Sequence, residues 1–159
     1  MTLIERFRHF RRVSTPLEAV TTADPRSTIK LLAKVRLNVT DTEPPMVAWD
    51  VVRGHRGANE SGIQAASTLG TPEDTVQAPA LLLERALQLP GETILFLINA
   101  HRFLDDAAVE QSIWNLRDEF KRDRRTLVLL APDIKLPLSL QHDVFLVDDP
   151  LPDAEQLGG

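Results

Sequence analysis

Two continuous apolar stretches constrain most strongly what this chain can fold into. Residues Thr93–Ile98 read TILFLI, and residues Thr126–Leu130 read TLVLL. Because neither stretch alternates apolar with polar residues, a strand formed by either must be covered on both faces. Between them, apolar residues from Val109 to Phe120 recur at spacings of 4, 3 and 4, which predicts an amphipathic helix. Strands that alternate with helices in this way predict a parallel sheet between two layers of helices.

The predicted fold is therefore α/β, a three-layer sandwich with a mostly parallel five-stranded sheet. The expected strands are Leu17–Thr21, Met46–Val52, Thr93–Ile98, Thr126–Leu130 and Val144–Val147. Helices are expected over Leu3–Arg12, from Asp24-Pro25 to about Asn38, over Val76–Leu89, and after a cap at Asp105 or Asp106. The glycine-rich stretch Arg53–Asp74 reads as one long loop, which is usually functional or mobile. Trp49 and Trp114 are expected in or near the core.

Length and composition bound the class of protein. The 159 residues suit one domain, which we divide into a basic amphipathic arm over residues 1–14 and an α/β domain over 15–157. The chain has no cysteine, no signal-peptide pattern and no apolar run near the roughly 20 residues of a membrane helix. We therefore expect a cytoplasmic protein with no membrane contact.

Charge is distributed unevenly along the chain. The net charge is −5, yet residues 1–36 carry eight Lys or Arg against three Asp or Glu. This asymmetry argues against a protein whose whole surface grips nucleic acid, and it leaves a basic arm that can touch an acidic partner. Within that arm, cations and aromatics are interleaved at Arg6, Phe7, Phe10 and Arg11. This pattern indicates either a surface that contacts a protein partner or nucleic acid, or an amphipathic helix that packs on its own domain.

The ends of the strands are where ligands bind in an open parallel sheet. The turn after the first strand, Thr21–Thr28, reads TTADPRST and has no glycine or lysine to hold a phosphate, while Pro25 lacks an N–H. The third strand ends in Asn99-Ala100, which supplies no carboxylate for a metal. The sequence therefore predicts no catalytic residue, no metal and no cofactor, and it favours helix capping as the role of Asp105 and Asp106.

Histidines and arginines supply the remaining candidates. His101 follows the third strand, but no histidine pair has metal-ligand spacing and no Gly-x-Ser-x-Gly elbow exists, so a hydrogen-bonded structural histidine is favoured. The stretch RGHRG places Arg53, His55 and Arg56 among glycines, as a contact surface, an anion site or a solvated loop. An anion site that also uses Arg26 requires the three arginines to converge on one cleft at the carboxyl ends of the strands.

The order of these pieces resembles AAA-type ATPases from about Leu17 to Leu157. The strand ILFLINA lies at the Walker B position, RTLVLLAPD at the sensor strand, and LPLSLQHDVFLVDDPLPDAEQL looks like the closing strand and the entry to the helical lid. The segments VAWDVVRG and HRFLDDAAVEQSIWNLRDEFK are similar to the family's second strand and third-strand-to-helix passage. The chain looks most like the degenerate N-terminal AAA-like domain of the chloroplast and cyanobacterial open-reading-frame branch.

The departures from the family determine the expected function. Thr21–Thr28 replaces the Walker A loop, Asn99-Ala100 replaces the Walker B acids, and Ala131-Pro132 stands where a sensor residue is expected. The resemblance thus implies a catalytically inert interaction or regulatory module, as the N-terminal part of an active AAA ATPase or as its partner in trans. Oligomerisation would come through a C-terminal part beyond this chain. The alternatives are an arginine-based nucleotide or anion site, and nucleic-acid contact through the arm.

Overall fold

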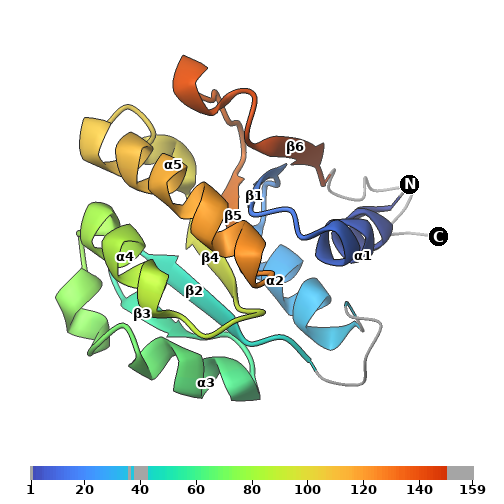
Figure 1. The fold of residues 1–159 in the computed structure, drawn as a ribbon. Helices are drawn as coiled ribbons and strands as arrows, with labels where there is room; N and C mark the ends of the chain where they lie inside the picture. Colours follow the sequence, from blue (N-terminus) through green and yellow to red (C-terminus); the bar gives the residue numbers. More distant parts are fainter. Residues whose placement is uncertain (1, 36, 38–42, 150–159) are drawn as a thin grey trace.

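A six-stranded sheet forms the centre of the computed structural model, which describes residues 2–35, 37 and 43–149 (Figure 1). The strand order is β3-β2-β4-β5-β1-β6, and all neighbours are parallel except the β2–β3 pair. The strands are β1 (Leu17–Thr21), β2 (Met46–Asp50), β3 (Gly54–Gly57), β4 (Ile94–Ile98), β5 (Thr126–Ala131) and β6 (Phe145–Asp148). The α/β prediction is confirmed, with one strand more than expected. The family-like lid entry and the end of the predicted domain, residues 150–157, lie outside the described residues.

Helices cover both faces of this sheet. The α-helices are α1 (Leu3–Val13), α2 (Pro25–Lys34), α3 (Glu60–Ser67), α4 (Pro79–Arg85) and α5 (Ala107–Arg122). Short 3₁₀ turns are η1 (Pro72–Thr75), η2 (Ala86–Gln88), η3 (Ala100–Arg102) and η4 (Leu138–Leu140). The helix after β1 ends earlier than expected, at Lys34, and the predicted Val76–Leu89 helix is a short α4 followed by η2. Of the two predicted caps for α5, Asp106 is the one used: its Oδ1 accepts from Ala108 N at 2.8 Å and from Val109 N at 3.1 Å.

Alternation along the strands separates two apolar clusters, because successive side chains of a strand point to opposite faces. On one face α3, α4 and α5 pack over a cluster that includes Trp49, Leu97 and Phe120. On the other face α1 and α2 pack over a cluster that includes Phe7 and Leu32. The expected three layers are therefore present. The α5 stripe lies entirely in the first cluster, through Val109, Ile113, Leu116 and Phe120.

The predicted long loop at Arg53–Asp74 is wrong. The segment instead forms β3, α3 and part of η1. Two glycines permit this compact path. Gly54 has a φ of +75°, a value that side chains rarely adopt, and a Cβ added at Gly62 would lie 1.8 Å from Met46 O. The segment is thus a packed part of the domain, and the arginines that it carries hold defined positions.

The basic arm is also part of the domain. Phe7 is fully buried, Phe10 is 7% exposed and Arg11 is 3% exposed. The Arg11 guanidinium donates to Glu92 O and Glu92 Oε2, both at 2.8 Å, and to Arg124 O at 2.7 Å. Of the two interpretations of the arm, the packed helix is therefore the one observed.

Candidate functional site

The turn between β1 and α2 lies where a phosphate loop would be, and its own carboxylate occupies the helix end. Asp24 Oδ1 accepts from Ser27 N at 3.1 Å, and Ser27 Oγ donates to Asp24 Oδ2 at 2.7 Å. These hydrogen bonds from Ser27 lower the pKa of Asp24 below its ordinary value. Pro25, the first residue of α2, has no N–H to donate. The positively polarised N-terminal end of α2 is therefore already capped by the Asp24 carboxylate and offers few donors to a phosphate.

Two further carboxylates, on the last residue of β6 and on the residue after it, reach the same turn. Thr21 Oγ1 donates to Asp148, and Thr28 Oγ1 donates to Asp149 Oδ2 at 2.8 Å. The backbone closes the contact, because Asp149 N donates to Thr21 O at 2.8 Å. Phosphate oxygens in this position would face carboxylates instead of N–H groups and a lysine. Asp148 and Asp149 were not predicted at this turn, because they lie more than a hundred residues from Thr21 and Thr28 in the sequence.

The end of β4 provides no metal ligand set. Asn99 adopts the left-handed conformation with φ +57°, which asparagine tolerates, and Ala100 is fully buried. Within the described ranges, no group of three or more His, Cys, Asp or Glu could hold a metal ion. His101 is not the satisfied structural histidine that was expected, because its buried Nδ1 has no hydrogen-bond partner among the described residues.

The three arginines proposed for an anion site meet in one hollow. Its volume is about 230 Å³, and it lies between α2, the ends of β2 and β4, and the β2–β3 hairpin. It is lined by Arg26, Ile29, Lys30, Ala48, Asp50, Arg53, Arg56, Gly57, Ala58 and Ile98. The geometrical condition set for an anion site is therefore met, while binding of an anion stays a prediction. Lys30 was missed, although it lies four residues after Arg26 and hence on the same face of a helix.

Four other predicted contact residues are buried and are not available to a partner. Phe7, Phe10 and Arg11 pack inside the domain, as described above. His55 is 1% exposed, with Nδ1 2.7 Å from Thr75 Oγ1 and Nε2 2.8 Å from Gly70 O. The prediction that these four residues contact a partner is therefore wrong, because their side chains are buried and stabilise the fold. Arg6 remains exposed on α1.

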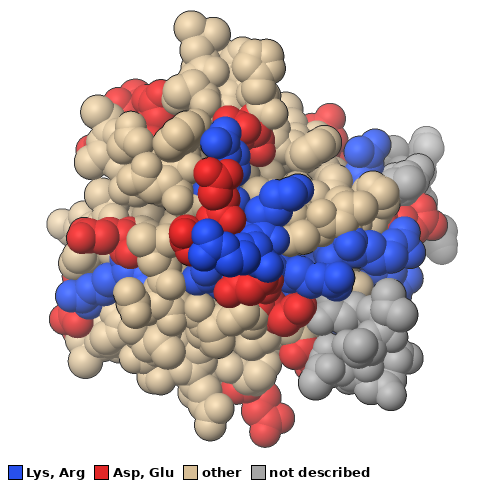
Figure 2. Space-filling model, viewed as in Figure 1, with Lys and Arg blue, Asp and Glu red and all other residues tan. Residues whose placement is uncertain are grey.

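Five of the other described arginines form ion pairs with residues distant from the hollow. Figure 2 shows Lys and Arg side chains lying beside Asp and Glu across the middle of one face. Ion pairs join Arg11 to Glu92 at 2.8 Å, Arg85 to Asp74 at 2.9 Å, Arg117 to Asp143 at 3.0 Å, Arg122 to Glu119 at 3.3 Å and Arg125 to Asp123 at 2.6 Å. The arginines of the hollow differ from these, since none of them takes part in such a pair within the described chain.

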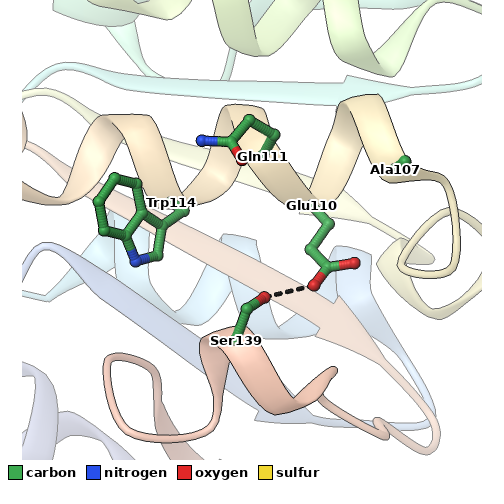
Figure 3. A pocket seen from close by; sticks show the side chains of 5 residues that line it. All are labelled: Ala107, Glu110, Gln111, Trp114 and Ser139. Atoms are coloured by element: carbon green, nitrogen blue, oxygen red, sulfur yellow. Dashed lines mark hydrogen bonds between the residues drawn. The ribbon is translucent and has the colours of Figure 1, made fainter.

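A second hollow, of about 380 Å³, lies on the outer side of α5 beside η4 (Figure 3). Ser139 Oγ donates to the carboxylate of Glu110 across it. Trp114 also lines this groove and is 41% exposed, contrary to its predicted core position, with the Arg117 guanidinium 4.8 Å from its ring centroid. The groove contains one carboxylate and no cation of its own, so it does not have the character of an anion site.

Fold and site together define an AAA-type α/β domain whose β1–α2 turn has no glycine or lysine and whose β4 strand ends in Asn99-Ala100. The chain belongs to the family described as the N-terminal domain of SpoVK-like AAA ATPases, whose family model matches residues 3–148. This match confirms the resemblance inferred from the sequence.

Two relatives extend this comparison. The "uncharacterized AAA domain-containing protein ycf46" of Guillardia theta is 26% identical over 112 residues, which are 70% of this chain and 20% of the relative. The protein of the same name from Gracilaria tenuistipitata var. liui is 30% identical over 71 residues, which are 45% of this chain and 14% of the relative. The matches thus span at most a fifth of either relative.

No helix among the described residues is long and apolar enough to cross a membrane.

Proposed function

We propose that this domain hydrolyses no ATP itself and serves as an interaction or regulatory module of an AAA ATPase, in the same polypeptide or in a partner chain. The observation that supports the proposal is the set of carboxylates at the β1–α2 turn. Asp24 caps α2, while Asp148 and Asp149 bond to Thr21 and Thr28.

The negative charge at this turn opposes the binding of a nucleoside triphosphate. Phosphoryl transfer depends on positioned donors and cations that neutralise the charge developing on the phosphate. Two like charges held a few ångströms apart repel each other, and surrounding water weakens the repulsion without removing it. The carboxylates of Asp24 and Asp149 would impose such repulsion on a bound triphosphate, and no lysine of the turn offsets it.

We expect the purified chain to release phosphate from Mg-ATP at the rate of the buffer blank. Continuous phosphate detection over hours measures this rate. A rate above the blank that disappears in Thr28→Val would overturn the inert assignment, because Thr28 is the hydroxyl nearest the place of a metal-binding residue in a phosphate loop.

The regulatory half of the proposal has its own test. The tagged protein is purified from its native cells and identified by mass spectrometry together with the proteins that co-purify. We expect Walker A and Walker B motifs either in a co-purifying protein or in another part of the tagged polypeptide. A matched purification with Trp114→Ala, which changes the exposed groove on α5, then asks whether that face is used. Recovery of neither kind of AAA ATPase would contradict this half.

A further inference from the structure

The hollow beside α2 concentrates positive charge. Arg26 and Lys30 come from α2, Arg53 follows β2, and Arg56 lies on β3. All four are exposed at the surface of the molecule. Like charges four residues apart on a helix repel each other, as Arg26 and Lys30 do here. The fold therefore brings together two pairs of cations that are distant in sequence, at a small cost in stability.

The four cations also lack internal partners. In the part of the chain that the structure describes, none of their side chains forms a hydrogen bond or an ion pair, whereas five other arginines form ion pairs. Asp50 is the one carboxylate among the lining residues. Its Oδ1 accepts from Val52 N at 3.0 Å and from Arg53 N at 2.8 Å, so it shapes the turn of the hairpin. The donors of the hollow remain free for an external anion.

The shape of the hollow selects among anions. Ala48, Gly57, Ala58 and Ile98 also line it, and their small or apolar side chains offer no acceptor to the four cations. A volume of about 230 Å³ suits a compact, multiply charged group better than an extended peptide. Arginine forks match phosphate oxygens in pairs, and lysine adds a point charge.

The hollow is separate from the β1–α2 turn. Among the described residues, no side chain that lines the hollow hydrogen-bonds to Thr22, Asp24, Thr28 or Asp149; the link between the two places is the backbone N–H of Arg26, which donates to the Asp24 carboxylate. A ligand held here would sit on the flank of α2 and not at its N-terminal end. The carboxylates that exclude phosphate from the turn therefore do not preclude a phosphate group in the hollow.

We propose that Arg26, Lys30, Arg53 and Arg56 form a binding site for a diphosphate group, either free or carried by a nucleotide. The site binds without metal and without hydrolysis. Because α2 and the β2–β3 hairpin both contribute cations, an occupied site ties the helix to the edge of the sheet. The proposal does not depend on the inert-module proposal, since hydrolysis and binding are measured separately.

The test is a calorimetric titration of the full chain at low salt with inorganic pyrophosphate, with ADP and with a polyglutamate peptide, all without magnesium. We expect pyrophosphate to bind and to raise the melting temperature. The double variant Arg53→Gln/Arg56→Gln should bind about tenfold more weakly or worse, because it loses two charge-assisted donors. Both side chains are exposed and have no partner among the residues that the structure describes, so the variant should keep the melting temperature of the unliganded chain.

The matched control is Arg6→Gln/Arg12→Gln on α1, which removes the same charge from two exposed arginines outside the hollow. It should bind pyrophosphate within about twofold of the unaltered chain, since distant exposed charges are screened. Tighter binding of ADP than of pyrophosphate, lost in the same variant, assigns the site to a nucleotide. Equal affinities assign it to the diphosphate group alone.

Three results would overturn the proposal. The first is no heat and no thermal shift with either pyrophosphate or ADP. The second is an equal loss of affinity in the Arg53→Gln/Arg56→Gln variant and in the α1 control, which indicates general attraction to positive charge. The third is tighter binding of the polyglutamate peptide than of pyrophosphate, which would make the hollow a contact site for an acidic protein segment.

Discussion

Replacement of Gly62 by alanine should lower the free energy of unfolding by about 3 kcal/mol. The Cβ that alanine adds would lie 1.8 Å from Met46 O and 2.8 Å from Met46 C. Both are backbone atoms at the start of β2, so neither can rotate away. To relieve the overlap, α3 must move off the sheet, and it must give up the burial of Ala65 and Ala66. Guanidinium denaturation of the variant and of the unaltered chain measures the difference.

Gly91→Ala is the matched control for this substitution. Its added Cβ would lie 3.5 Å from the nearest atoms of Asp123, which is ordinary van der Waals contact. We expect its free energy of unfolding to stay within about 0.5 kcal/mol of that of the unaltered chain. Equal midpoints for Gly62→Ala and the unaltered chain would show that α3 is not held against β2 as described.

The same segment shows where sequence reasoning failed for the fold. Continuous apolar runs located β4 and β5, and the apolar stripe located α5, because each of these signals is visible within one window of sequence. The segment Arg53–Asp74 has neither: β3 has four residues, two of them glycine, and the face that α3 buries is made of Gly62, Ala65 and Ala66. Asn59 does cap α3, accepting from Gly62 N at 2.8 Å, and this residue type was the available signal. The segment is ordered by long-range contacts, which no local pattern reports.

For the candidate sites, too, local sequence predicted some features, while others depend on contacts between distant parts of the chain. The lack of a phosphate loop could be predicted from Thr21–Thr28 alone, because glycine and lysine are absent there. The carboxylates that reach this turn come from Asp148 and Asp149, more than a hundred residues away, and only the β1–β6 pairing brings them there. Convergence of Arg26 with the hairpin arginines could be stated only as a condition, since it depends on how far α2 lies from the edge of the sheet.

Glu18 is expected to make the protein less stable as the pH rises. This residue of β1 is 1% exposed, and neither of its carboxylate oxygens has a hydrogen-bond partner among the described residues. Burial raises the pKa of Glu18 well above its ordinary 4.5, and the nearby charge of Arg11 only partly opposes this effect. Between the unfolded and the folded pKa, the folded chain holds a proton that the unfolded chain has released. The free energy of unfolding therefore falls with rising pH over that window, beginning near 4.5.

Glu18→Leu should remove this pH dependence and stabilise the chain by about 2 kcal/mol at neutral pH, since an apolar residue of similar size replaces a buried carboxyl group that has no hydrogen-bond partner among the described residues. Arg11 keeps its ion pair with Glu92 in this variant, so it is not left alone in the interior. Glu18→Gln is the informative companion: it also removes the charge, but it buries an amide, so it should lose the pH slope with a smaller gain in stability. Denaturation curves from about pH 4 to 8 compare the three proteins. Parallel pH profiles for the unaltered chain and Glu18→Leu would mean that Glu18 is ionised at no cost inside the fold, paired with Arg11 closely enough to offset its burial.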